Sequence, residues 1–349
     1  MKIFVTGVAG QLGHDVINEL MKRNDANQGS YECVGSDLAP VYSGAADGTA
    51  VTKCPYVSLD ITDTEAVENA LTQAAPDVVI HCAAWTAVDL AEDEDKKEKV
   101  RMVNAVGTEN FAKAVKKLDE TQPNGCKMVY ISTDYVFDGQ GEKPWDPDCK
   151  NYAPLNVYGE TKLAGELAVS QTLEKYFIVR IAWVFGQNGK NFIKTMLNVG
   201  KNHDKLTVVC DQIGTPTYTL DLSVLLCDMI ETDKYGYYHA TNAEVEPLNE
   251  KEATTGFSAE GCKLGYISWY DFTKEIFRLA VEAGHSEYGE DRITVLPVTT
   301  AEYGASKAAR PFNSRLDKSK LEKNGFAALP TWQDAVRRYI AELDFDHLA

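Results

Sequence analysis

The sequence predicts an α/β protein with a doubly wound parallel sheet and a smaller, mixed part toward the C-terminus. In the first 185 residues, short apolar runs alternate with amphipathic stretches of helical period. A glycine-rich turn, TGVAGQLG, follows the first apolar run directly. Strands that are buried on both faces and alternate with helices are typical of a parallel sheet covered by helices on both sides.

The elements of the first half follow one another in a regular order. The predicted strands are short runs rich in β-branched and aromatic residues, namely KIFVTG, YECVGSD, YVSLDI, DVVIHCAA, KMVYISTD and YFIVRIAWVFG. Apolar residues at helical spacing predict helices over residues 11–23, 63–75, 104–118 and 158–173. Asp63 or Thr64 supplies the side-chain oxygen that an N-cap needs at the start of the second helix.

The second half is less regular. KLTVVCDQIGTPTY predicts a strand and a loop, and helical spacing predicts helices over residues 220–230, 269–283 and 331–343. Two stretches, 39–53 and 243–266, are polar or rich in small residues and are expected to be insertions that run over the surface. No sharp linker is visible, so we expect a first domain over residues 1–185, a smaller part over residues 186–349, and later segments that return to pack on the first domain.

Composition narrows the classes of function. The chain has 349 residues and a net charge of −17, which argues against nucleic acid or an anionic membrane as a partner. No apolar run approaches the roughly 18 residues of a membrane span, and the start MKIFVTG does not resemble a signal peptide. The eight cysteines contain no C-x-x-C pair, so neither a disulfide scaffold nor a zinc site is suggested. We therefore expect a cytoplasmic protein with reduced thiols.

The glycine turn predicts a ligand. Gly7, Gly10 and Gly13 lie where the first strand passes into the first helix. The first glycine permits the tight turn, the second lets the backbone approach a pyrophosphate, and the third lets the helix pack closely on the strand. The N–H groups at the start of the helix favour an anion. In this context the pattern predicts a dinucleotide-binding Rossmann domain.

Two acidic residues end the next two strands. Asp37 ends YECVGSD, where its carboxylate can accept hydrogen bonds from the adenosine ribose hydroxyls. Asp60, followed by Ile61, ends YVSLDI, where it is expected to face the adenine amino group. A carboxylate at residue 37 repels a 2′-phosphate and no arginine follows it in SDLAPVY, so the sequence favours NADH. Lys22 or Arg23, at the end of the first helix, can still fold toward a 2′-phosphate, and NADPH therefore stays open.

A second motif, NVYGETKLAGE, predicts the chemistry. It places Tyr158 and Lys162 four residues apart, on one face of a helix. A lysine ammonium near a phenol favours the phenolate and is expected to lower the tyrosine pKa from about 10. Thr133 ends an earlier strand at the carboxyl edge, where doubly wound sheets bind their ligands. Beside a nicotinamide, Thr133 would polarise a carbonyl oxygen, Tyr158 would protonate it, and Lys162 would hold the nicotinamide ribose.

These and further motifs resemble the dTDP-4-dehydrorhamnose reductases, a family of extended short-chain dehydrogenases/reductases. The motifs run in family order from residue 6 to residue 317 and are TGVAGQLG, CAAWTAVDLAE, VNAVGT, STDYVFDG, VYGETKLAGE, RIAWVFG, DQIGTPTY and RPFNSRLD. The first and fifth are shared by the whole superfamily, whereas AAWTAVDLAE, STDYVFDG and RPFNSRLD are much more specific to this family.

The resemblance implies NADH- or NADPH-dependent reduction of the 4-keto group of a dTDP-6-deoxy-hexulose, giving dTDP-L-rhamnose. It places Thr133, Tyr158 and Lys162 in the catalytic positions. It implies a cofactor site that also includes Gln11, Leu12, Ile61, Ala83, Ala84 and Asn104, the last of which helps to place the lysine. For the dTDP-sugar it implies a sugar pocket lined by Val88, Asp134, Tyr135 and Trp183. It also implies a diphosphate contact at Arg310, with Asn313 and Ser314 beside it. Gln212 and residues 215–217 are expected to lie in the loop that borders the nucleotide.

The chain departs from the family pattern at three places. Cys82 stands where an asparagine is common, Trp85 stands where a tyrosine or histidine is frequent, and the stretch 243–266 is additional. Some members hold magnesium at a dimer contact, but those glutamates do not map onto this sequence, so we expect no metal. A homodimer is compatible with the resemblance.

Other functions of the same fold remain open. One alternative is another nucleotide-sugar 4-ketoreductase or an epimerase, and an epimerase would need a tightly held NAD⁺ that is regenerated in each cycle. A dehydratase is disfavoured because Thr133 is followed by Asp134 and Tyr135, without the glutamate that removal of water requires. A non-catalytic, dinucleotide-binding regulatory subunit would have lost catalytic residues, and all three are present here.

Overall fold

A seven-stranded parallel sheet forms the centre of the computed structural model, which describes residues 1–45, 48–259 and 262–348. The strand order is β11-β6-β5-β4-β1-β2-β3, and every neighbouring pair runs parallel. The strands are β1 (Lys2–Thr6), β2 (Glu32–Asp37), β3 (Tyr56–Ser58), β4 (Val78–His81), β5 (Lys127–Thr133), β6 (Tyr176–Ile181) and β11 (Gly236–His239). Because the order reverses between β1 and β4, a crevice for a ligand is expected at their carboxyl ends.

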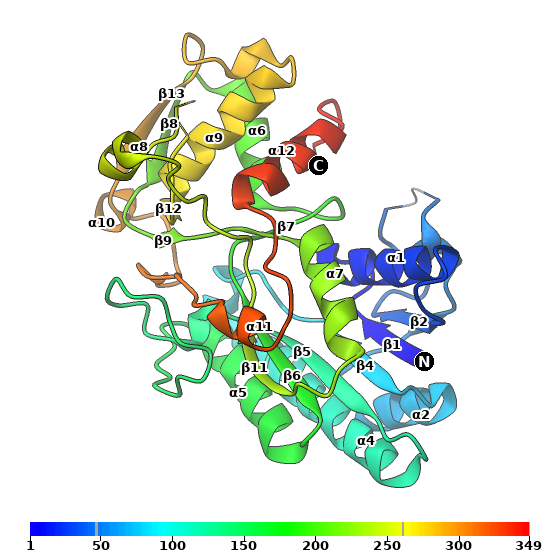
Figure 1. Cartoon of the computed structure of the whole chain (residues 1–349). Helices are drawn as coiled ribbons and strands as arrows, with labels where there is room; N and C mark the ends of the chain where they lie inside the picture. The colour runs from blue at the N-terminus through cyan, green and yellow to red at the C-terminus, as the bar shows by residue number, and fades with distance from the viewer. Residues whose placement is uncertain (46–47, 260–261, 349) are drawn as a thin grey trace.

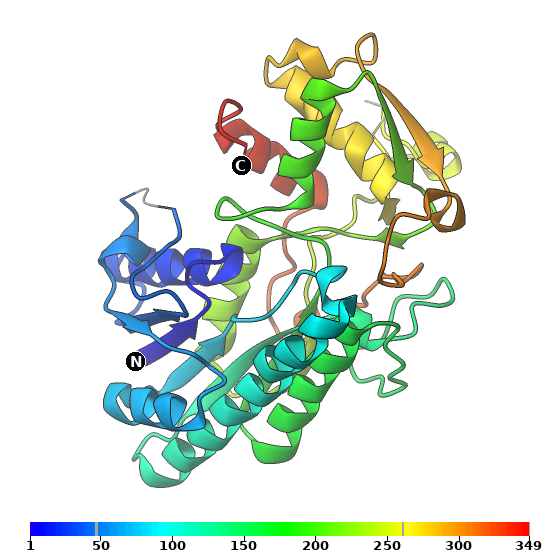
Figure 2. The ribbon, with the colours of Figure 1, turned by 180° about the vertical axis from the view of Figure 1, so that it is seen from behind.

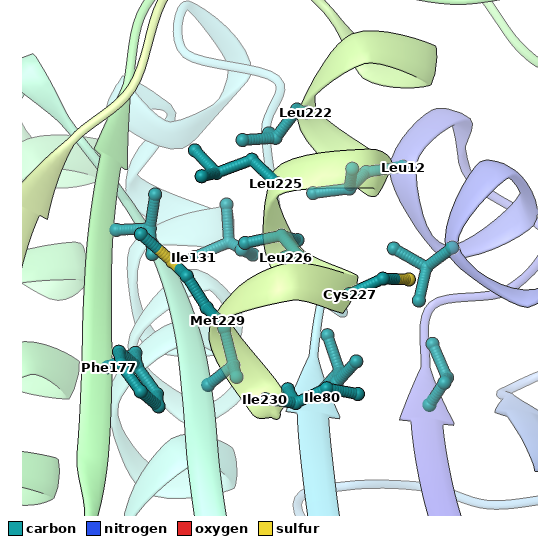
Figure 3. Close-up of a cluster of buried hydrophobic side chains, with 14 of the residues drawn as sticks. Leu12, Ile80, Ile131, Phe177, Leu222, Leu225, Leu226, Cys227, Met229 and Ile230 are labelled. Carbon is teal, nitrogen blue, oxygen red and sulfur yellow. The ribbon is translucent and has the colours of Figure 1, made fainter. Parts of the chain in front are cut away.

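Helices cover both faces of this sheet (Figures 1 and 2). One layer contains α1 (Gln11–Asp25) and α7 (Thr219–Ile230), and the other contains α2 (Thr64–Ala74), α4 (Gly107–Thr121) and α5 (Val157–Thr172). Side chains alternate between the two layers along each strand, so that Val5 packs in the first core and Phe4 in the second. Figure 3 shows Leu226 and Met229 of α7 packed with Ile80 and Ile131 of the sheet.

The smaller part lies beyond the carboxyl edge of the sheet and has its own core (Figure 1). Its longer helices are α6 (Phe192–Asn202), α9 (Trp269–Glu282) and α12 (Trp332–Glu342), which pack with the parallel pair β8 (Lys205–Val209) and β13 (Thr294–Val298). Short strand pairs join β7 (Val184–Phe185) to β10 (Thr217–Tyr218) and β9 (Ile213–Gly214) to β12 (Ile267–Ser268). Two further short helices of this part are α8 (Glu250–Thr255) and α10 (Thr300–Tyr303). Helix α11 (Ser319–Lys323) instead packs on the large sheet, where Leu321 joins the first core.

The predicted fold class is confirmed, and later segments do return to the first part. After residue 185 the chain adds α7 to one face of the sheet and β11 to its edge, where β11 pairs with β6. The boundary at residue 185 itself stays a prediction. Among the described residues, no helix combines the length and the apolar character that crossing a membrane requires.

Three local expectations were wrong. The run YFIVRIAWVFG is interrupted between β6 and β7, where Trp183 has a φ of 52° that no strand adopts. The helix expected from residue 104 begins earlier, as α3 (Glu94–Arg101), and passes through a π-turn, η3 (Met102–Val106), into α4. The two insertions do not lie wholly on the surface, because the apolar side chains of Val51, Cys262 and Leu264 are buried. Residues 46–47 and 260–261 of these stretches lie outside the described residues.

Candidate active site

The glycine turn has the shape that a pyrophosphate needs. Gly7 has a φ of 70°, which favours glycine, and a Cβ on Gly13 would lie 2.4 Å from the carbonyl oxygen of Gly7. A Cβ on Gly7 would lie 2.8 Å from the backbone nitrogen of Ala83, so β1 and the segment after β4 approach closely here. Helix α1 begins directly after Gly10, and no side chain among the described residues caps it. Its N–H groups therefore fit an anionic ligand.

Asp37 lies beside this turn, and its contact with the adenosine ribose stays a prediction. Its Oδ2 accepts a hydrogen bond from the Ala9 N–H over 3.0 Å, while Oδ1 accepts one from Leu38 N–H over 2.8 Å. Asp60 has a different local role, because its exposed carboxylate accepts hydrogen bonds from the backbone and hydroxyl of Thr62. The side chain of Ile61, the next residue after Asp60, packs against Gly107 of α4. An adenine contact at Asp60 stays a prediction.

Asn104 joins three parts of the site. It lies in the π-turn η3 and is buried, with its Oδ1 accepting from the Trp85 N–H over 2.7 Å. Its amide nitrogen donates to the Trp85 carbonyl over 3.1 Å and to the Thr161 hydroxyl over 3.2 Å. Asn104 therefore ties the segment that holds Ala83 and Ala84 to helix α5, one residue before Lys162. The π-turn, a feature frequent at functional sites, gave no sequence signal.

Thr133, Tyr158 and Lys162 come together at the carboxyl edge of the sheet. Thr133 is the last residue of β5, and helix α5, which is capped by Asn156 through the Gly159 N–H over 2.8 Å, carries the other two. A Cβ on Gly159 would lie 2.4 Å from the Tyr135 carbonyl oxygen, so only glycine lets α5 approach this closely. The half-buried ring of Tyr158 meets the ring of Tyr135 edge-on, with centroids 5.5 Å apart.

We predicted that Lys162 lowers the pKa of Tyr158, and this prediction was wrong for the protein without bound cofactor. The ammonium of Lys162 donates to the Ile131 carbonyl over 2.7 Å and lies 4.2 Å from the centre of the Tyr130 ring. Burial raises the pKa of Tyr158 well above its ordinary value, and the Thr133 hydroxyl only partly opposes this effect. Burial also lowers the pKa of Lys162 to about 7, although the charge of Glu166 acts in the other direction. At neutral pH the phenol is therefore protonated.

Asp134, which directly follows Thr133 in the chain, is a buried acid beside the catalytic threonine. Its Oδ1 accepts a hydrogen bond from the Thr133 hydroxyl over 3.0 Å. Its Oδ2 has no hydrogen-bond partner among the described residues, although the Ser314 hydroxyl faces the carboxyl and favours its charged form. Burial outweighs this influence and raises the pKa of Asp134 to about 6.

The predicted diphosphate residue Arg310 already has a partner. Its guanidinium makes two hydrogen bonds with Asp89, of 3.1 Å to Oδ1 and 2.7 Å to Oδ2. The pKa of Asp89 is held low, chiefly by this arginine. The pair is only partly exposed, and it lies close enough to Tyr135 for both charges to act on that phenol. Sequence reasoning missed Asp89, although it lies within the family motif AAWTAVDLAE.

The other predicted substrate residues divide into two groups. Val88 and Tyr135 are half-buried, and Tyr135 contacts Tyr158. A sugar contact at Val88 stays a prediction. Asn313 and Gln212 are buried and use their amides within the protein, on the Lys143 carbonyl over 2.8 Å and on the Thr300 hydroxyl over 3.0 Å, respectively. These two amides therefore hold together the loops from which they and their partners come.

Trp183 belongs to an aromatic stack in the smaller part. Its ring stacks on Trp269 with centroids 3.7 Å apart, and its left-handed backbone turns the chain between β6 and β7. Backbone strain of this kind persists where the surroundings fix it, and it is frequent at functional sites. A sugar contact at Trp183 stays a prediction.

A cavity and the distribution of possible metal ligands were also compared with the predicted site. A cavity of about 700 Å³ lies at the opposite edge of the sheet, lined among others by Lys2, Cys33 and Cys54, and contains none of the predicted site residues. Among the described residues, no three His, Cys, Asp or Glu side chains gather as they would around a metal ion.

Comparisons with known proteins point to one family. The family model described as RmlD substrate binding domain matches residues 1–345. The dTDP-4-dehydrorhamnose reductase of Escherichia coli is 35% identical over 290 residues, which cover 81% of this chain and 85% of that protein. The protein of the same name from Aggregatibacter actinomycetemcomitans is 34% identical over 344 residues, which cover 96% and 97%.

Solved structures agree. A dTDP-4-dehydrorhamnose reductase from Clostridium acetobutylicum has a TM-score of 0.77 and 36% identity, covering 97% of this chain and 98% of that one. The one from Bacillus anthracis, in complex with NADP, has a TM-score of 0.74 and 34% identity, covering 98% and 99%. A UDP-glucose 4-epimerase from Thermus thermophilus, in complex with NAD, has a TM-score of 0.70 at 18% identity, covering 100% and 99%, a likeness that extends to the fold alone.

Proposed function

Because the chain belongs to the dTDP-4-dehydrorhamnose reductase family, we propose that it reduces the 4-keto group of dTDP-4-dehydro-L-rhamnose to give dTDP-L-rhamnose, with NADH or NADPH as reductant. The observation that carries the proposal is the convergence of Thr133, Tyr158 and Lys162 beside a glycine turn shaped for a pyrophosphate. The eight cysteines of the described residues are free thiols, which supports a cytoplasmic location. The homodimer stays a prediction.

Some of these residues would bind the cofactor, and others would act on the substrate carbonyl. The turn at Gly7 to Gly13 and the carboxylate of Asp37 would hold the adenosine diphosphate half of the cofactor, and Lys162 the nicotinamide ribose. When bound, a reduced nicotinamide supplies a hydride for the carbonyl carbon. Thr133 binds the carbonyl oxygen and draws electron density toward it, and the Tyr158 phenol donates a proton to that oxygen.

A direct test is the oxidation of NADH and NADPH with a panel of 4-keto-6-deoxy nucleotide sugars. We expect one equivalent of cofactor to be consumed for each equivalent of a dTDP-4-keto sugar reduced. An epimerase would regenerate its cofactor in every cycle, so turnover without net oxidation would contradict a reductase. A regulatory subunit would bind the cofactor and consume none.

Asp37→Ala is expected to narrow any preference for NADH over NADPH. The carboxylate lies at the end of β2, where it repels a 2′-phosphate. The measurement is the ratio of kcat/KM for the two cofactors in the wild type and the variant, with Asp77→Asn, at the opposite edge of the sheet, as control. An unchanged ratio in Asp37→Ala would mean that this carboxylate does not meet the ribose.

Arg310→Ala is expected to raise KM for the dTDP-sugar more than KM for the cofactor. The guanidinium is held by Asp89 with part of its surface exposed, so that it can still meet a diphosphate. Lys307→Ala is a matched control, because this more exposed cation of the same segment pairs with Asp93. Equal changes in the two KM values for Arg310→Ala would count against a diphosphate contact.

A further inference from the structure

The Thr133 hydroxyl is hydrogen-bonded to the carboxyl of Asp134 in the structure. It donates its hydrogen to Oδ1 of Asp134 over 3.0 Å and accepts from the Tyr135 N–H over 3.2 Å. A hydroxyl has a single hydrogen to donate. While Asp134 is a carboxylate, a charge-assisted bond holds that hydrogen. Thr133 can therefore donate to a substrate carbonyl only after this bond breaks or reverses its direction.

Asp134 is placed so that its neutral form is accessible. The side chain is 4% exposed, and Oδ2 has no hydrogen-bond partner among the described residues. An ionised carboxylate is costly in such surroundings, because burial penalises the charge. Burial raises the pKa of this carboxyl to about 6, against the hydroxyls of Ser314 and Thr133, which favour the charged form.

The neighbouring titratable groups come from three directions. Tyr135 follows Asp134 in the chain and Tyr158 faces it from α5; the negative charge of Asp134 raises the pKa of both phenols. Arg310 and Asp89, which are paired with each other, shift the pKa of the Tyr135 phenol in opposite directions. No cation pairs directly with Asp134 among the described residues.

We propose that Asp134 is a positioning residue that gates Thr133 by its protonation state. The proposal rests on the proposed reductase function. With a proton on Oδ1, the carboxyl donates to the Thr133 oxygen, and the threonine hydrogen is free to point at the substrate carbonyl oxygen. Without that proton, the hydrogen bond runs from Thr133 to Asp134, and Thr133 offers the substrate no donor. The gate requires only uptake of one proton from water and rotation of one hydroxyl.

The test is the pH dependence of kcat for the wild type and Asp134→Asn, measured on both sides of pH 6. In the wild type, kcat should fall as the carboxyl ionises, approaching tenfold per pH unit. In Asp134→Asn the amide N–H₂ is a permanent donor to Thr133, so this fall should disappear and kcat should exceed that of the wild type at the alkaline end. Asp146→Asn, which removes an exposed charge and keeps an acceptor for the Asp148 N–H, should retain the wild-type profile.

Two outcomes would overturn the gate. One is a fall in kcat above pH 6 in Asp134→Asn that matches the fall in the wild type. The other is a loss of more than tenfold in kcat at every pH in an Asp134→Asn protein that binds NADPH normally, since the charged form would then be the required one. Should this variant not fold, Thr133→Val replaces it, because its residual kcat should no longer follow the titration.

Infrared spectroscopy separates failure of the gate from failure of the proposed function. In the protein without substrate, the carboxylic acid C=O stretch of Asp134 should appear as the pH falls through about 6 and should be absent in Asp134→Asn. No such band in the folded wild type would overturn the gate. A wild type that shows the band but reduces no nucleotide sugar at any pH would overturn the reductase function.

Discussion

Tyr158→Phe is expected to lower kcat by about a hundredfold or more, because general acid catalysis typically contributes 10²–10⁴. Reduction needs a protonated group beside the carbonyl oxygen, and burial keeps the phenol of Tyr158 protonated at neutral pH. The phenyl ring preserves the edge-on packing with Tyr135, so binding of NADH or NADPH should be unchanged. Steady-state kinetics and cofactor titration measure the two effects separately.

The matched control for this variant is Tyr176→Phe, which removes a phenol hydroxyl at the amino end of β6, away from the cluster. It should leave kcat unchanged. If Tyr158→Phe turned over like the wild type, another group would have to protonate the substrate. If it lost cofactor binding as well, its defect would not be one of proton donation.

Glu166→Gln is expected to lower the free energy of unfolding by about 3–5 kcal/mol, the usual cost of breaking a buried ion pair. Glu166 of α5 and Arg180 of β6 are fully buried and joined by two hydrogen bonds of 2.8 Å. Arg180 also donates to the Pro147 carbonyl over 3.1 Å and to the Tyr152 hydroxyl over 3.2 Å. The variant leaves a buried guanidinium without its carboxylate.

Urea unfolding of the wild type, Glu166→Gln and Glu109→Gln measures this effect. Glu109 makes a partly exposed pair with Lys113 on α4, so its loss should cost about 1 kcal/mol or less. Because Glu166 lies one turn after Lys162 on the same helix, the buried pair also fixes the catalytic face of α5. A Glu166→Gln protein as stable as the Glu109→Gln control would show that the pair does not stabilise the helix.

Much of the fold was readable because its signals are local. The glycines of the first turn, the Asp63 cap and the Tyr158–Lys162 spacing each act within one or two turns of chain, and the structure places them as predicted. The strand breaks and buried insertions were missed. Trp183 leaves the strand because its ring stacks on Trp269, a partner 86 residues away in the chain.

The electrostatics of the site could not be read from spacing. Sequence places Lys162 one turn from Tyr158 but does not say that its ammonium bonds to the Ile131 carbonyl. The Arg310–Asp89 pair joins residues 221 positions apart, and nothing in either motif names the other as its partner. These contacts depend on how β5, α5 and the returning C-terminal segment meet.

Hydride transfer with cofactor deuterated at the transferable C4 position tests the central claim most directly. We predict that dTDP-4-dehydro-L-rhamnose yields dTDP-L-rhamnose carrying one deuterium at C4 of the sugar, visible by NMR, for each cofactor oxidised. A product without deuterium at that carbon, or cofactor that is never oxidised in its presence, would contradict the assignment.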